Sequence, residues 1–354
     1  MAQINKPSEY FNTKLYTGNA TTNHTQTGIG FQPDWLWIKE RGGTGSHILV
    51  DAVRGVSSSS TPFIKTNSTG AEVSSNTSDF IKSLDSDGFT LGADSYFTDV
   101  NKNSSTYASW NWKANGAGSA NTDGDVTSTV SVNTTSGFSI VKWDSTGTAG
   151  INIGHGLGQK PAMIIAKCLN QSSTSFPVYH QSLGATKYVS LQATTAETTS
   201  ATRWNNSEPT TITFQTGSSG DIGGSDRTMI AYCFAEKKGF SKFGKYTGNG
   251  STDGTFVYTG FKPAWVMIKN VGTSNWTMHD NKRNPFNQVA DRLYANLSNA
   301  EDVGGAYGVD FLSNGMKMRT SEGTSWNGSG GTFIYMAFAE NPLVGTNNIP
   351  TTAR

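Results

Sequence analysis

The sequence predicts an all-β protein of three tandem antiparallel β-sandwich modules, each resembling a jelly roll. Three observations predict this fold: a strand motif that occurs three times, an aromatic strand that closes each copy, and short β-branched and aromatic runs bounded by turn residues. Such runs are typical of antiparallel sheets. The repeats are near 100 residues, whereas solenoid units take about 20–50. We therefore expect each copy to be a small domain with its own core.

The clearest repeat joins a proline to an apolar strand and occurs as GFQPDWLWIKE, GLGQKPAMIIAK and GFKPAWVMIKN. Its prolines are Pro33, Pro161 and Pro263. The last aromatic residues of the closing strands are Trp112, Phe234 and Phe338, which follow the prolines by 79, 73 and 75 residues. This nearly constant spacing predicts the same order of strands in every copy.

Other elements repeat between these two landmarks. An opening strand precedes the proline motif, at residues 14–22, 140–150 and 243–254. A polar turn follows the motif, as DAVRG, HQSLG and DNKRN, and a middle hairpin comes next, at residues 85–92, 210–217 and 312–320. We expect one short helical turn per copy near the polar turn, around residues 51–56 and 284–293.

Thinning of aromatic residues marks the boundaries between copies. They divide the chain into residues 1–116, residues 117–238 with a linker at their start, and residues 239–354 with a C-terminal tail. The second junction is short, so the second and third copies are expected to pack rigidly together. If the copies are separate modules, removal of residues 1–116 should leave a soluble, cooperatively folding remainder.

The polar turns carry charged residues at a fixed spacing. Asp51 and Arg54 are three residues apart, as are Asp280 and Arg283. On a helical turn such residues face each other, so each pair is expected to pin its turn to the sandwich as an ion pair. His180 stands where the other copies have aspartate, which favours an orienting hydrogen bond over a catalytic role.

Composition bears on several classes of partner. The formal charge is +1, and no basic run occurs, so nucleic acid is not an expected partner. No apolar stretch approaches the roughly 20 residues that a membrane helix needs, and membrane insertion is not expected. The two cysteines, Cys168 and Cys233, lie in apolar strands and are expected to be small buried hydrophobes.

Residues for catalysis are sparse. The five histidines do not cluster at a spacing expected for metal ligands or acid–base work, and no GxSxG motif occurs. We therefore expect no enzyme activity, no cofactor and no metal site.

Aromatic residues are the remaining candidates for binding. Rings with polar neighbours can hold sugars, because ring faces meet C–H groups while the neighbours bind hydroxyls. The candidate glycan contacts are Trp204, Asn205, Trp276, Trp326 and Asn327. The tryptophans that recur within strand motifs are expected to be core residues instead; they are Trp35, Trp37, Trp110, Trp112 and Trp265.

The motifs also resemble those of a known group of proteins. The segments YFNTKLYTGN, GIGFQPDWLWIK, ILVDAVRG, YASWNWKANGAG and KYTGNGSTDGTFVYTGFKPAWVMIK resemble a repeat-bearing virion or tail-fibre protein family of tailed bacteriophages that infect marine bacteria and cyanobacteria. The resemblance spans essentially the whole chain. It implies a location in the virion but no established biochemical activity.

The expected function is that of a phage structural protein, as a tail fibre or host-contacting appendage with an adhesion role. The expected partners are other virion proteins and a host cell-surface glycan, and a homotrimer is the expected type of assembly. The alternative is a capsid-decorating or cement protein, whose modules would bind the shell instead of a host.

Overall fold

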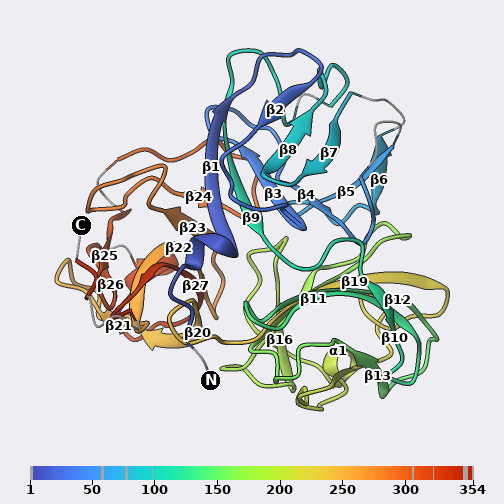
Figure 1. Cartoon of the computed structure of the whole chain (residues 1–354). Coiled ribbons are helices and arrows are strands. Elements are labelled where there is room, and N and C mark those ends of the chain that lie inside the picture. The colour runs from blue at the N-terminus through green and yellow to red at the C-terminus, as the bar shows by residue number, and fades with distance from the viewer. Residues whose placement is uncertain are drawn as a thin grey trace.

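The computed structural model describes residues 3–56, 60–75, 79–97, 99–304, 307–321, 323–345 and 350–352. Over these residues the chain forms several antiparallel sheets, which confirms the predicted all-β class. Figure 1 shows three groups of strands, one from each copy, around a common centre. Parts of the predicted C-terminal tail, residues 346–349 and 353–354, lie outside the described residues.

The strands are short and end at turns rich in small polar residues. Copy 1 (residues 1–116) contains η1 (Pro7–Glu9), β1 (Phe11–Thr17), β2 (His24–Gln26), β3 (Trp35–Glu40), β4 (Ile48–Asp51), β5 (Thr61–Lys65), β6 (Val73–Ser75), β7 (Ile81–Asp85), β8 (Gly88–Leu91) and β9 (Thr106–Trp112). Copy 2 (residues 117–238) contains β10 (Ser119–Asn121), β11 (Ser128–Asn133), β12 (Phe138–Ser145), β13 (Ile151–Gly154), β14 (Met163–Cys168), β15 (Pro177–His180), β16 (Lys187–Ser190), β17 (Thr198–Thr199), α1 (Ala201–Trp204), β18 (Thr213–Thr216) and β19 (Arg227–Phe234). Copy 3 (residues 239–354) contains β20 (Ser241–Thr247), β21 (Phe256–Tyr258), β22 (Phe261–Asn270), β23 (Trp276–Asp280), β24 (Leu293–Tyr294), β25 (Val309–Leu312), β26 (Gly315–Met318), η3 (Gly323–Asn327) and β27 (Thr332–Pro342).

The described strands of each copy form one large and one small sheet. The large sheets have the orders β1-β9-β3-β4-β5-β6, β10-β11-β12-β19-β14-β15-β16-β17 and β20-β27-β22-β23-β24. The small sheets are β2-β8-β7, β13-β18 and β21-β26-β25. In every large sheet the closing strand lies between the opening strand and the strand of the proline motif. The predicted repetition of strand order is therefore present in the hydrogen-bonding pattern.

The strand of the proline motif is buried on both faces. In β3, Leu36 and Ile38 belong to a core within copy 1, whereas Trp35 and Trp37 point to the opposite side of the sheet. Equivalent clusters lie within copies 2 and 3. The expected core of each copy is thus accompanied by a fourth cluster, hereafter the central cluster, to which all three copies contribute.

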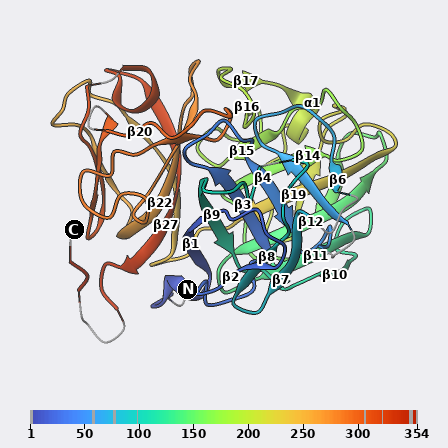
Figure 2. The ribbon, with the colours of Figure 1, turned by 90° about the horizontal axis from the view of Figure 1, so that it is seen from above.

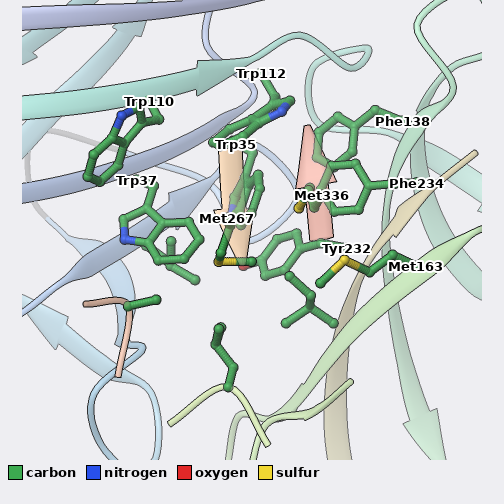
Figure 3. Close-up of a cluster of buried hydrophobic side chains, with 14 of the residues drawn as sticks. Trp35, Trp37, Trp110, Trp112, Phe138, Met163, Tyr232, Phe234, Met267 and Met336 are labelled. Atoms are coloured by element: carbon green, nitrogen blue, oxygen red, sulfur yellow. The ribbon is translucent and has the colours of Figure 1, made fainter. Parts of the chain in front are cut away.

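Three equivalent rings meet within the central cluster. They are the last aromatic residues of the closing strands: Trp112, Phe234 and Phe338. Their ring centroids are 5.5–6.5 Å apart in all three pairings. Figure 3 shows Trp112 above Trp35, and Phe138 stacked on Phe234. We call Trp112, Phe234 and Phe338 the inner triad. It joins copies that are far apart in the sequence.

The N-terminal segment packs against copy 3. The ring of Phe11 in β1 stacks on that of Phe338 at 5.1 Å, and Figure 2 shows β1 beside β22 and β27. The backbone N–H of Ile4 also donates to the carbonyl oxygen of Lys238, the last residue before copy 3, at 3.1 Å. First and last copies are therefore direct neighbours.

The expected helical turns differ from the observed backbone. Residues 52–54 form a turn after β4, and residues 284–292 are irregular. The α-helix among the described residues is α1 in copy 2, whose N-terminal N–H of Thr202 is capped by the Ser200 hydroxyl. The polar turns are held by side-chain hydrogen bonds instead, so a helix is unnecessary.

Candidate functional site

Two of the polar turns contain buried ion pairs. The carboxylate of Asp51 accepts hydrogen bonds from Nε of Arg54 at 2.6 Å and from the Arg54 backbone N–H at 2.9 Å. Asp280 and Arg283 form the same pair at 2.5 and 2.9 Å. These side chains are at most 1% exposed. The structure thus places both predicted turn pairs where they hold the turn closed.

Burial and charge act in opposite directions on these arginines. Burial by itself would lower the pKa of Arg54, but the carboxylates of Asp51 and Glu72 raise it above its ordinary value. In copy 3 the carboxylates of Asp280 and Glu301 likewise outweigh burial and raise the pKa of Arg283. Both guanidinium groups stay charged inside the protein, and each depends on its neighbouring carboxylates.

Each polar turn also bonds to the closing strand of the next copy. The contacts are Tyr232 Oη to Asp51 at 2.9 Å, Trp110 Nε1 to Asp280 at 3.0 Å, and His180 Nε2 to the carbonyl oxygen of Tyr335 at 3.1 Å. Copy 1 is thereby joined to copy 2, copy 2 to copy 3, and copy 3 back to copy 1. The hydrogen bonds form a closed ring around the central cluster.

The exceptional turn of copy 2 has a local explanation. Trp110 and Tyr232 offer an N–H and an O–H to the facing aspartates, but the equivalent residue of β27 is Met336, which has no donor. An aspartate facing Met336 would be buried without that bond. His180 can instead donate to a backbone carbonyl, and its Nδ1 accepts the Ser182 N–H at 3.1 Å. Histidine in place of aspartate at position 180 of copy 2 thus matches methionine at position 336 of copy 3, across the seam where the two copies meet.

A second ring of contacts uses a repeated Ala-Glu dipeptide. The backbone N–H groups of its glutamates donate to the next copy, from Glu72 to Leu169, from Glu197 to Val271 and from Glu301 to Arg41, each at 2.7 Å. The side chain of Glu301 also binds both Arg41 and Arg283 at 2.7 Å. These glutamates are therefore inter-copy connectors, which the sequence analysis missed.

Three buried lysines lie at equivalent positions on the proline-motif strands. Burial lowers the pKa of Lys39, Lys167 and Lys269 to about 8 each. Backbone carbonyls bind their ammonium groups: Lys39 reaches Gly43 at 3.0 Å, Lys167 reaches Thr174 at 2.7 Å, and Lys269 reaches Gly272 at 2.8 Å. Donors that are bonded to loop carbonyls in this way hold the loops in place.

Four of the five histidines are buried. Burial lowers the pKa of His155 and His180 to about 4, and it holds the pKa values of His47 and His279 well below the ordinary range. Neutral imidazoles suit these sites, because each ring can donate or accept a hydrogen bond without a charge. As the pH falls, these histidines therefore take up a proton in the unfolded chain before they do so in the folded chain.

We predict that stability falls as the pH drops from about 6.5 to about 4. A histidine with a depressed folded-state pKa takes up its proton in the unfolded state first, so each such residue raises the equilibrium constant for unfolding by up to about tenfold for every pH unit of acidification in this window. His180→Asn keeps an acceptor for Ser182 but cannot titrate. Urea unfolding at several pH values should show a slope that is smaller by about one proton in this variant; an unchanged slope would contradict the assignment.

The aromatic residues proposed for glycan contact lie elsewhere than expected. Trp204, Trp276 and Trp326 are only 0–1% exposed. Trp204 packs edge-on against Tyr179, Trp276 donates from Nε1 to the carbonyl oxygen of Ser190 at 2.9 Å, and Trp326 lies 4.0 Å from the His279 ring. Their assignment to glycan contact is corrected, because no ring face is open to a ligand.

The two asparagines beside these tryptophans have structural roles. Asn205 adopts a left-handed conformation with φ 49° at the C-terminus of α1, a position that asparagine tolerates well. Asn327 is fully buried, and its Nδ2 donates to the carbonyl oxygens of Ser251 and Thr320 at 2.8 and 2.9 Å. The asparagines next to Trp204 and Trp326 therefore indicate turns, and these turns cover the two rings. The strand-motif tryptophans, Trp35, Trp37, Trp110, Trp112 and Trp265, are buried as expected.

Reactive groups are likewise enclosed. Both cysteines are free and buried, and burial raises the pKa of the Cys233 thiol. In the described part of the chain, no group of three or more His, Cys, Asp or Glu side chains is placed to hold a metal ion. No helix among those residues is long and apolar enough to cross a membrane.

Residues 6–342 match a family described only as a domain of unknown function, DUF7483. The chain belongs to this family. No curated protein and no solved structure matches it. The DUF7483 match runs through all three copies, as do the central cluster and both rings of contacts.

The sequence contained a signal for the connectors of this DUF7483 chain. Ala-Glu follows the first residue of each polar turn by 21, 17 and 21 residues, at Glu72, Glu197 and Glu301. Comparison of the three copies at that distance finds the motif. Its role as a bridge between copies could not be predicted from the spacing. The bridging group is a backbone N–H, which nearly every residue type has, so the identity of the side chain does not reveal it.

Proposed function

We propose that this protein is a non-catalytic structural component of a bacteriophage virion, as a tail fibre or host-contacting appendage. Three jelly-roll-like β-sandwich modules would form its body, and a cell-surface glycan and other virion proteins would be its partners. The phage assignment rests on the resemblance of the sequence motifs. The geometry supports the structural role.

One observation carries the proposal: buried charged groups of two polar turns join neighbouring copies. Asp51 and Asp280 each bind an arginine of their own turn and a ring of the next copy. Together with the shared central cluster, these contacts favour a rigid body over three independent units. Such a body suits display, because its outer loops keep fixed positions relative to one another.

The module assignment rests on the pairing of sheets. Each large sheet packs one face on a core that also contains residues of the small sheet of the same copy, such as Leu36 with Phe89 in copy 1 and Val266 with Met316 in copy 3. Two antiparallel sheets around one core are the arrangement of a sandwich. The expected homotrimer stays a prediction, which native mass spectrometry of the full chain decides.

The test is electron cryomicroscopy of phage particles that carry this chain, with antibody fragments against it to mark its place. Three fused lobes on the tail or baseplate are the expected result. Lobes on capsomer faces would favour capsid decoration instead and overturn the host-contact role. Absence of the chain from purified particles would overturn the virion assignment itself.

A further inference from the structure

A small cavity lies at the seam where copy 3 meets copy 1. Its volume is 110 Å³. The residues that matter for its chemistry are Phe11, Asn12 and Thr13 from β1, with Asn281, Lys282 and Glu340 from copy 3. This seam closes the ring of copies, so the cavity is formed by segments from opposite ends of the chain.

A small side chain, Thr13, lines this cavity, whereas the equivalent positions of the other two copies have larger side chains. The strand registers place Thr13 opposite Trp110, Ile140 opposite Tyr232, and Phe243 opposite Met336, so Thr13, Ile140 and Phe243 are equivalent in the three copies. Isoleucine and phenylalanine are larger than threonine. The hydroxyl oxygen of Thr13 is also buried, and it has no hydrogen-bond partner among the described residues. A buried hydroxyl without a partner is unfavourable unless water or a ligand satisfies it.

A charged pair is also altered at this seam. Between copies 2 and 3, Lys242 crosses to Glu236 at 2.6 Å. The equivalent residues here are Asn12 and Glu340, and Asn12 cannot form that ion pair. Glu340 instead accepts a hydrogen bond from Nδ2 of the buried Asn281 at 2.9 Å. The seam has lost both the bulky side chain and the crossing cation that the neighbouring seam retains.

We propose that this cavity binds the edge of a sugar ring, as the terminal residue of a neutral glycan. Amide, hydroxyl and carboxylate groups on its wall can bind sugar hydroxyls, while Phe11 and two alanines, Ala264 and Ala339, supply apolar surface for C–H groups. The Glu340 carboxylate is paired with Lys262 of its own copy at 3.5 Å, and Lys282 is exposed at the rim. A cavity of about 150 Å³ holds a benzene ring, so 110 Å³ suits one edge of a pyranose whose remainder projects outward.

This inference rests on the proposed adhesion function and names its binding site. The proposed binding site does not involve the buried tryptophans Trp204, Trp276 and Trp326. The three seams share one backbone arrangement, but only the seam between copies 3 and 1 combines Thr13 with Asn281 and Lys282. A single glycan site per chain follows.

The experiment uses the purified full chain on an array of mono- and oligosaccharides built from hexoses, deoxyhexoses and N-acetylhexosamines. Binding to at least one neutral glycan is expected. Thr13→Ile, which installs the side chain of copy 2, should weaken that binding at least tenfold, and so should Asn281→Ala, which adds no bulk. The matched control is Thr17→Ile, at an exposed position of the same strand, and it should bind like the parent.

Two outcomes would overturn the inference. One is binding that Thr13→Ile and Asn281→Ala leave unchanged while both variants keep the parental unfolding midpoint, because the glycan site would then lie elsewhere. The other is an array on which no glycan binds, which would leave water as the occupant of the cavity. Localisation of the chain on virions tests the proposed function separately, so the two failures are distinguishable.

Discussion

Deletion of residues 1–116 is expected to leave a remainder that aggregates or fails to unfold cooperatively. This reverses the expectation for separate modules, because copy 1 covers the central cluster of the other two copies. Phe138, Tyr232, Phe234, Trp265 and Phe338 would lose contacts in that cluster. At about 1.5–3 kcal/mol for each side chain, full exposure costs about 8–15 kcal/mol, which is as large as the stability of a typical domain.

Size-exclusion chromatography and thermal unfolding of residues 117–354 check this result. Co-expression with residues 1–116 as a separate chain is the control, and we expect the two fragments to form a soluble complex. A monomeric, cooperatively unfolding remainder without the first fragment would contradict the shared core.

The second large effect is expected from Asp280→Ala. This change removes the carboxylate that pairs with Arg283 and accepts from Trp110, and it leaves a guanidinium buried in the seam. Breaking a buried pair in this way costs about 3–5 kcal/mol. We expect a value near the lower end, since Glu301 still binds Arg283 at 2.7 Å.

Urea unfolding at neutral pH measures this loss. Asp253→Ala is the matched control, because the Asp253 side chain is 81% exposed, and exposed ion pairs contribute about 0–1 kcal/mol. If the two variants lost similar amounts of stability, the buried pair would not hold the seam together.

Internal repetition predicted much of the fold. The three aromatic residues used to measure the repeat, Trp112, Phe234 and Phe338, are the ones that meet in the inner triad. The aspartate–arginine spacing of the polar turns likewise corresponded to buried pairs. Both signals could be read because each position appears three times in one chain, so that equivalent residues could be compared directly.

The central cluster could not be predicted from the same patterns. Both faces of the proline-motif strand are apolar, and an alternation of period two cannot distinguish a face buried within a copy from one buried between copies. Trp35 and Leu36 therefore looked alike in the sequence.

The glycan assignment failed for a related reason. The polar neighbours of Trp204 and Trp326 indicated a turn but not the side of the turn on which the ring lies. The seam cavity depends on the small size of Thr13 relative to residues in two other copies, and its significance appears only when the registers align them.

The closed ring of contacts also has a consequence for synthesis of the protein. Arg41 and Glu301 are 260 residues apart in the chain, and ribosomes add about 5–20 residues per second. Glu301 of copy 3 is therefore synthesised about 10–50 s after its partner Arg41 in copy 1. Throughout that interval the face that carries Trp35 and Trp37 is without its final cover, so the nascent chain is most exposed to misassociation before its last third has been translated.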